Sequence, residues 1–148
     1  MTAIGQDQAQ LKLALSHLQR GEAGVAEPLL RGLAAQNNGT AMYYLGAICR
    51  MRDHNEAAAR RWFRSGADLG DTQCMFEVGT WLLMERDFKS ARHWLEPAAA
   101  AGADNAMLNL GSLLLATDDR EGARMWWQRA AKQGNAAAKQ LLRANFPA

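Results

Sequence analysis

The sequence lacks the long apolar run that a membrane span requires, and it has few of the residues that form disulfide frameworks and metal sites. Its 148 residues include only two cysteines, three histidines and three prolines. No stretch approaches the roughly 18 uninterrupted apolar residues of a membrane span, and the N-terminal region lacks a basic start followed by an apolar block. The sequence therefore predicts a cytoplasmic protein that makes no use of a membrane.

The cysteines and histidines do not form a ligand set. Cys49 and Cys74 occupy apolar positions of predicted helices, where a free thiol acts as a small apolar side chain. His17, His54 and His93 are far apart in the sequence, and no Cys or His pair has the spacing of zinc ligands. We expect two free, buried thiols, no metal and no cofactor.

Patterns that indicate catalysis or nucleic-acid binding are also missing. The sequence contains no local Ser, His and acid constellation and no Gly-rich loop between a strand and a helix. The paired carboxylates of Asp118 and Asp119 lie in a predicted turn, where helix capping accounts for them. A formal net charge of +2 is too small to indicate nucleic acid. We expect no catalytic residue, no small-molecule substrate and no nucleic-acid partner.

What the sequence does contain is a repeat of 32 or 33 residues. Two rows of small residues define the interval: Ala14, Gly46, Gly79 and Gly111, and Ala26, Ala59, Ala91 and Ala123. The interval of 33 falls in a different gap for the two rows, which places one extra residue in the loop at 53–55. A period of this size indicates stacked supersecondary units, none of which can bury its apolar face alone.

Both halves of each unit place apolar residues at helical spacing, so that each unit is predicted to be a helical hairpin. The predicted helices span about 7–20, 22–36, 40–52, 55–69, 72–85, 88–101, 104–117 and 119–133, with a last helix at 135–145. Residues 1–5 are expected to be a frayed start, and Thr40 is a candidate N-cap. We predict one domain, 1–148, with units at about 7–38, 39–70, 71–102 and 103–134 and a capping helix at 135–146.

The best-formed unit carries a family resemblance. It places Ala106, Leu110 and Gly111 in its first half, and in its second half Ala123, Trp126-Trp127, Ala130-Ala131 and Gly134-Asn135. This pattern resembles the Sel1-like repeat, a relative of the tetratricopeptide repeat, and the first unit is a degenerate copy. The resemblance implies an all-α, right-handed α-solenoid of four helical hairpins plus a C-terminal capping helix, used as a scaffold for protein–protein contact.

Two rows on the second half of each unit lead to different predictions. The aromatic row of Trp62, Trp94 and Trp126 is interpreted as core, because stacked units bury large side chains at the repeat interval. The basic row is Arg60, Arg92 and Arg124. We expect this outer basic row to be a solvated surface, with contact to an acidic partner as the alternative.

The row with most relevance to binding lies on the first helices, at positions that line the inner concave surface in the tetratricopeptide family that this chain resembles. The candidate groove residues are Tyr43, Arg50, Phe76, Leu83, Leu108 and Leu115. They are mostly apolar, which predicts a groove for an apolar or amphipathic segment of another protein, or for a second copy of the chain. The alternative is that a tightly wound array buries them against itself.

The leading functional hypothesis is a non-catalytic adaptor that receives such a segment in its groove. The alternative is a small dedicated antagonist or chaperone, such as an immunity protein or a secretion chaperone, which rests on analogy with other helical repeats.

Overall fold

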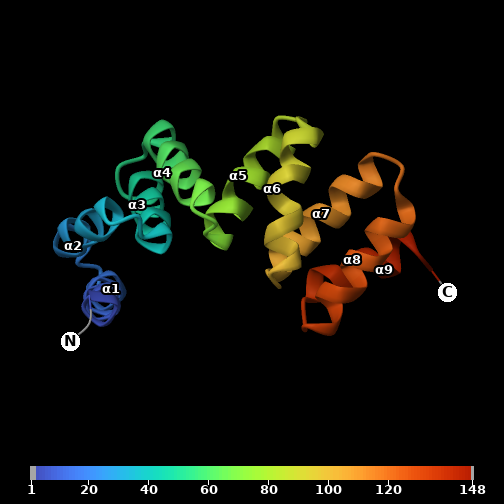
Figure 1. The fold of residues 1–148 in the computed structure, drawn as a ribbon. Helices are drawn as coiled ribbons and strands as arrows, with labels where there is room; N and C mark the ends of the chain where they lie inside the picture. The colour runs from blue at the N-terminus through green and yellow to red at the C-terminus, as the bar shows by residue number, and fades with distance from the viewer. Residues whose placement is uncertain (1–2, 148) are drawn as a thin grey trace. The chain divides into compact units, whose positions relative to one another are not determined.

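The computed structural model describes residues 3–147, and within them the chain is helical without a β-strand (Figure 1). The helices are α1 (Ala3–Gln19), α2 (Ala23–Ala35), α3 (Gly39–Met51), α4 (Glu56–Asp68), α5 (Thr72–Met84), α6 (Phe88–Ala100), α7 (Asp104–Ala116), α8 (Arg120–Lys132) and α9 (Ala136–Asn145). The prediction of helical hairpins followed by one last helix is confirmed. The first helix begins before the predicted residue 7, and Met1 and Thr2 lie outside the described residues.

The chain divides into two compact units. The first runs to Cys74 and holds α1 to α4 and the first turn of α5, while the second begins at Met75 and holds the rest of α5 and α6 to α9. Within the first unit α1 pairs with α2 and α3 with α4, and within the second α7 pairs with α8 and α8 with α9. The single domain expected from the sequence stays a prediction.

Each turn between α1 and α9 contains one residue with a positive φ angle. Within hairpins these residues are Gly21, His54, Arg86 and Asp118, and between hairpins they are Asn37, Gly70, Gly102 and Gly134. Both series step by 33, 32 and 32 residues. A positive φ angle places a residue in the left-handed region, and a residue in this conformation after a helix turns the chain away from the helix axis. Glycine and asparagine most often occupy this position.

The residue after this left-handed position often caps the next helix. Asn38, Asn55, Asp87, Asp119 and Asn135 each accept a hydrogen bond from a backbone N–H in the first turn of the helix that follows. The prediction that Thr40 caps α3 is wrong. Asn38 does so, while the hydroxyl of Thr40 lies 3.0 Å from a carboxylate oxygen of Asp71 and donates to it.

The turn from α3 to α4 is one residue longer than the corresponding turn from α5 to α6. Three residues, 52–54, precede the N-cap Asn55, whereas two residues, 85–86, precede Asp87. This confirms the position of the extra residue that the unequal intervals predicted. The added residue lengthens the turn and leaves the helices at 13 residues each.

On the second helix of each hairpin, the fully buried residue lies one position after the row of Trp residues that the sequence analysis predicted to be core. This fully buried row consists of Leu30, Phe63, Leu95 and Trp127. Trp94 is buried too, but Trp62 and Trp126 are only half-buried, so the prediction of a uniform Trp core is wrong for these two. Consecutive residues of an α-helix point about 100° apart, so only one of two adjacent rows can face the first helix of the hairpin.

Small residues allow the two helices of each hairpin to approach closely. A Cβ atom placed on Gly46 would lie 2.5 Å from Cε1 of the Phe63 ring, and one on Gly79 would lie 2.6 Å from Cγ of Leu95. Gly111 meets the indole of Trp127 in the same way. The helices therefore cross closely at these glycines, and the side chains that meet each glycine belong to the fully buried row.

Candidate protein-binding surface

Four of the predicted groove residues lie on α5 and α7 of the second unit. Phe76 and Leu83 come from α5, and Leu108 and Leu115 come from α7. All four side chains are half-buried and pack on one side against the core of this unit. The remaining part of each side chain is accessible, so neither full burial nor full exposure describes this row.

A polar pair lies among these apolar side chains and joins the two helices. The Asn109 amide donates to the hydroxyl oxygen of Thr80 across 2.8 Å, which places α5 and α7 side by side at this level. Leu108 is held from the core side, because the indole N–H of Trp127 donates to its carbonyl oxygen at 3.0 Å. We refer to Phe76, Leu83, Leu108 and Leu115, together with Thr80 and Asn109, as the α5/α7 surface.

The other two groove residues, Tyr43 and Arg50, lie on α3 of the first unit. Tyr43 is half-buried, and its ring lies 5.2 Å from that of Tyr44 and 5.9 Å from that of Phe63 between centroids. The Arg50 guanidinium lies 4.7 Å from the Phe63 ring centroid and donates to Glu56 at 3.0 Å. The arrangement therefore combines aromatic faces with a cation whose position is set by a ring and a carboxylate.

The structure brings one groove residue together with one residue of the outer basic row. Arg50 and Arg60 both contact the carboxylate of Glu56, at 3.0 and 3.4 Å. The bond from Arg50 is the main reason why the pKa of Glu56 lies below its ordinary value, and Arg60 adds to this effect. The two rows that the sequence assigned to different faces therefore meet at one carboxylate in this repeat.

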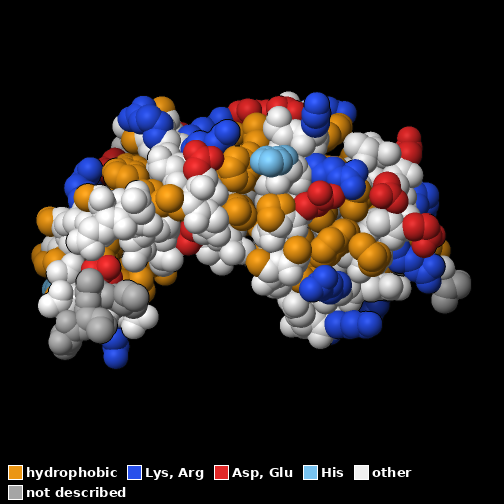
Figure 2. Space-filling view, in the orientation of Figure 1, with side chains coloured by type: hydrophobic (Ala, Val, Ile, Leu, Met, Phe, Trp, Pro, Cys, Tyr) orange, Lys and Arg blue, Asp and Glu red, His pale blue; other side chains and the backbone are white. Residues whose placement is uncertain are grey.

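The outer basic row is not uniform. Arg92 pairs with Glu96 one turn later on α6, at 2.6 Å, whereas the Arg124 guanidinium lies 5.8 Å from the ring centroid of Phe146. Figure 2 shows hydrophobic side chains interspersed with charged side chains of both signs on the face that it draws. The row therefore does not form a strip of free positive charge.

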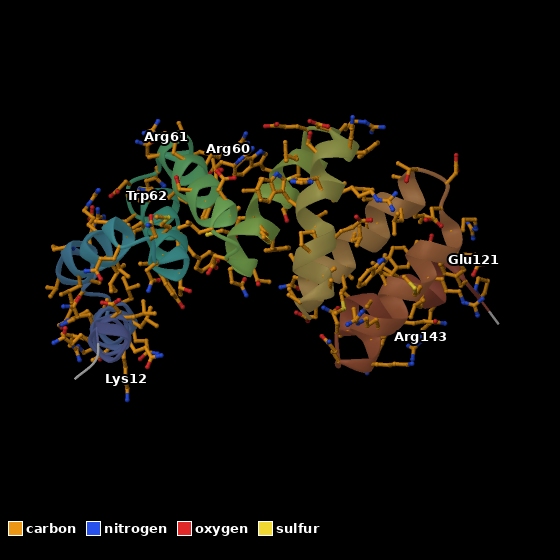
Figure 3. All side chains as sticks on the ribbon, viewed as in Figure 1. Lys12, Arg60, Arg61, Trp62, Glu121 and Arg143 are labelled. Carbon is orange, nitrogen blue, oxygen red and sulfur yellow. The ribbon has the colours of Figure 1, made fainter. Side chains whose placement is uncertain are left out.

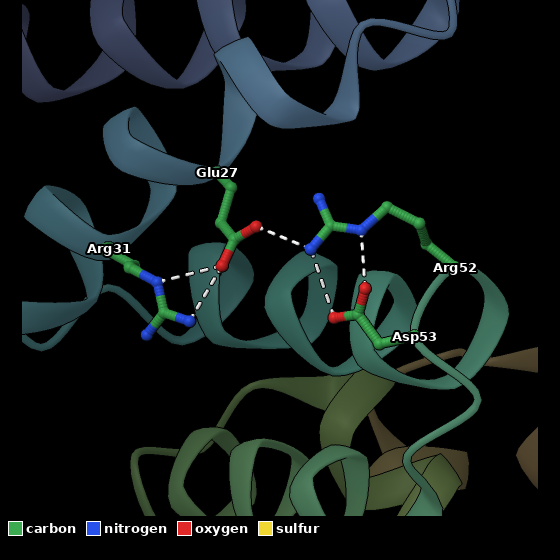
Figure 4. A network of polar contacts seen from close by, with 4 residues as sticks. All are labelled: Glu27, Arg31, Arg52 and Asp53. Carbon is green, nitrogen blue, oxygen red and sulfur yellow. Dashed lines mark hydrogen bonds and ion pairs between the residues drawn. The ribbon is translucent and has the colours of Figure 1, made fainter.

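A polar network that sequence reasoning missed surrounds the lengthened turn (Figure 4). Glu27 on α2 accepts hydrogen bonds from Arg31 at 2.7 Å and from Arg52 at 2.8 Å, and Arg52 also donates to Asp53 at 2.6 Å. Arg31 first and Arg52 second hold the pKa of Glu27 below its ordinary value, and Arg52 does the same for Asp53. The extra residue at 53–55 was the only sequence signal for this network, which we call the turn network.

Cys49 and Cys74 are both buried, as predicted, and neither takes part in a disulfide. Burial raises the pKa of the Cys49 thiol above its ordinary value, with a smaller contribution from the charge of Asp53. Within residues 3–147 no group of three or more His, Cys, Asp or Glu side chains is placed to hold a metal ion. No helix in the described part of the chain is both long and apolar enough to cross a membrane.

The repeated hairpins, with a small residue at each helix crossing, define a helical-repeat protein of the tetratricopeptide-like class. The chain belongs to the Sel1 repeat family, whose model matches residues 33–71, 74–102 and 105–135. The first hairpin lies mostly outside these matches, in agreement with its degenerate sequence. No curated protein matches the chain.

Solved structures of the same family share this fold. One is c5321, a protective antigen of uropathogenic Escherichia coli with an SLR fold, at 30% identity, a TM-score of 0.79 and 89% coverage of this chain. Another is a Sel1 repeat protein from Oxalobacter formigenes, at 25% identity, a TM-score of 0.78 and 93% coverage. This chain spans 32% and 45% of the lengths of those two proteins. A MamA structure, at 19% identity over 90% of this chain and 81% of its own with a TM-score of 0.60, shows similarity of fold alone.

Proposed function

We propose that this chain is a non-catalytic adaptor that binds an apolar or amphipathic segment of another protein through the side chains of its first helices. Repeats of this family are generally protein-interaction scaffolds. The observation that carries the finer proposal is the α5/α7 surface, where four apolar side chains from two adjacent helices are anchored in the core but remain accessible.

The chemistry of this surface suits a short amphipathic segment. Apolar side chains of a partner would cover Phe76 and Leu108, which contribute binding free energy by leaving water. Thr80 lies one turn after Phe76 on α5 and Asn109 follows Leu108 on α7, and this bonded pair offers hydrogen bonds that fix the orientation of the bound segment. In the first unit, Tyr43 supplies an aromatic contact of the kind that often dominates interface energetics.

Affinity capture followed by mass spectrometry tests the proposal. The immobilised protein is compared with the Phe76→Ser, Leu108→Ser double variant and with Met125→Ser, in which an exposed apolar side chain of α8 changes in the same way. Partners that bind the α5/α7 surface should be lost with the double variant and kept with Met125→Ser. Thermal melting must show that both variants remain folded, because Phe76 and Leu108 also touch the core.

A second comparison separates this surface from the outer basic row. Arg92→Glu should keep every partner of the α5/α7 surface. If Arg92→Glu loses the partner while the double variant keeps it, the proposal is wrong and the second helices carry the binding site. Recovery of a single partner in equimolar amount would indicate a dedicated antagonist or chaperone, and recovery of several would indicate a general adaptor.

A further inference from the structure

A pocket of about 480 Å³ opens on the first unit between α2, the lengthened turn and α4. Arg31 of α2, Asp53 of the turn and Arg61 and Trp62 of α4 line it, with the Cys49 thiol also in its wall. Arg61 and Trp62, both labelled in Figure 3, are consecutive residues of α4. Tyr43 and Arg50 do not line this pocket, so it is distinct from the surface proposed above.

The charges around the pocket leave one cation without a partner. The turn network already pairs Glu27 with Arg31 and Arg52, and Asp53 with Arg52. Among the residues that the structure describes, Arg61 makes no ion pair or hydrogen bond through its side chain, and it is exposed. The guanidinium groups of Arg31 and Arg52 are balanced by the carboxylates of Glu27 and Asp53. The guanidinium group of Arg61 is therefore the excess positive charge.

The wall next to Arg61 is apolar. The Trp62 side chain is half-buried, and the Arg31 guanidinium lies 5.9 Å from the centroid of its ring. Arg31 is itself held by Glu27, and another part of the indole packs against the core of the first unit, so only the remaining part of the Trp62 side chain is accessible to the pocket. The buried Cys49 thiol, whose pKa is raised by desolvation, adds no negative charge near neutral pH.

The lengthened turn contributes to the pocket and its charges. The additional residue in the turn at 52–54 supplies Asp53 to the lining and Arg52 to the network that neutralises it. The shorter turn from α5 to α6 has no such residue. Because Asp53 in the pocket lining is already paired with Arg52, it does not neutralise Arg61. The Arg61 guanidinium is therefore available to a ligand.

We propose that this pocket binds a peptide segment of a partner protein in which an acidic residue stands next to an apolar one. The partner's carboxylate accepts hydrogen bonds from the Arg61 guanidinium, whose planar fork suits a carboxylate. The neighbouring apolar side chain packs on the free part of the Trp62 indole. A simple inorganic anion would satisfy Arg61 alone and leave the indole exposed to water.

Titration of the full-length protein with capped dipeptides tests this site. The probe is N-acetyl-Glu-Leu amide, its uncharged control is N-acetyl-Gln-Leu amide, and inorganic phosphate at equal ionic strength is the anion control. The ¹⁵N signal of the Trp62 indole, assigned by its loss in Trp62→Phe, reports binding. The Glu peptide should shift this signal saturably, and the Gln peptide should bind at least about threefold more weakly, because a charged hydrogen bond is lost.

Two matched variants locate the charge. Arg61→Gln should weaken binding of the Glu peptide at least about threefold, while Arg64→Gln, which removes a charge from the same helix outside the pocket, should leave it unchanged. Equal shifts with the Glu and Gln peptides, equal shifts with phosphate, equal losses in both variants or no saturation would each overturn the proposal. Because Phe76 and Leu108 are not involved, these results are independent of those for the α5/α7 surface.

Discussion

Two helical glycines show how strongly the local surroundings decide the effect of one methyl group. At Gly46 an added Cβ would lie 2.5 to 2.8 Å from three atoms of the Phe63 ring, whereas at Gly32 it would meet no atom within 4 Å beyond its own stretch of helix backbone. Gly46→Ala should therefore lower the free energy of unfolding by roughly 1 to 3 kcal/mol through overpacking. Gly32→Ala should raise it by about 0.5 to 1 kcal/mol, because alanine loses less conformational entropy in a helix. Urea unfolding of both variants checks this, and effects of the same sign would contradict it.

The adjacent pair Trp126 and Trp127 gives a second test at this scale. Trp127 is 1% exposed and its indole N–H donates to the Leu108 carbonyl, while Trp126 is half-buried. Trp127→Ala should cost roughly 3 to 5 kcal/mol, and Trp126→Ala should cost clearly less. Thermal or urea unfolding measures both. Equal costs would show that burial does not distinguish the two rows.

The same pair shows what the sequence could not decide. The repeat interval led to the prediction that the row containing Trp126 is core, but large apolar residues occupy both adjacent positions of the repeat. Which one lies inward depends on the rotation of the second helix about its axis. The rotation of α8 about its axis is set by the packing of Trp127 against Gly111 of α7. No local sequence pattern determines this rotation.

At the level of elements, Glu27 connects α2 to the turn after α3. Because Arg31 and Arg52 hold its pKa below the ordinary value, its carboxylate stabilises the fold above about pH 4.3, and this stabilisation is lost as the pH falls through the lower pKa of the folded protein. Glu27→Gln should lower the free energy of unfolding by about 1 kcal/mol at pH 7, with a difference that shrinks towards zero in acid.

Urea midpoints at pH 7 and pH 3 measure this dependence. Glu121 on α8 is a suitable control, since among residues 3–147 it makes no ion pair, and Glu121→Gln should change little with pH. A difference for Glu27→Gln that is as large at pH 3 as at pH 7 would show that the carboxylate charge is not responsible.

Helices were easier to predict than the surface that they carry. Apolar spacing placed most helix ends within about a residue or two of those observed, and the structure shows left-handed Gly70 and Gly134 at helix ends and Asp87 and Asn135 as N-caps. Half-burial of the groove residues, by contrast, depends on how closely α5 and α7 approach. The hydrogen bond between Thr80 and Asn109 links residues 29 positions apart, which no helical period encodes.

For the whole molecule, α5 is the element that bears on cooperativity. It contributes residues to both compact units, since the division falls between Cys74 and Met75 inside this helix. We predict one cooperative unfolding transition, because unfolding of either unit breaks hydrogen bonds of a helix that the other unit needs. Far-UV circular dichroism reports on both units, while four of the five Trp residues lie after Cys74. Separate midpoints for circular dichroism and Trp fluorescence in urea would contradict the single-domain prediction.

The regular spacing of the positive-φ residues in the turns limits which insertions and deletions a gene that encodes these repeats can accept. Because the turn signals recur every 32 or 33 residues, duplication or loss of one whole interval leaves each helix with its own stop and start. A duplication that is not a whole number of intervals would join a helix to the wrong partner or delete a cap. Single-residue insertions can survive only within a turn, as at 52–54, where the left-handed His54 and the N-cap Asn55 are kept. Unequal crossing-over between neighbouring repeats is therefore a route by which the length of these proteins can vary while each hairpin still folds.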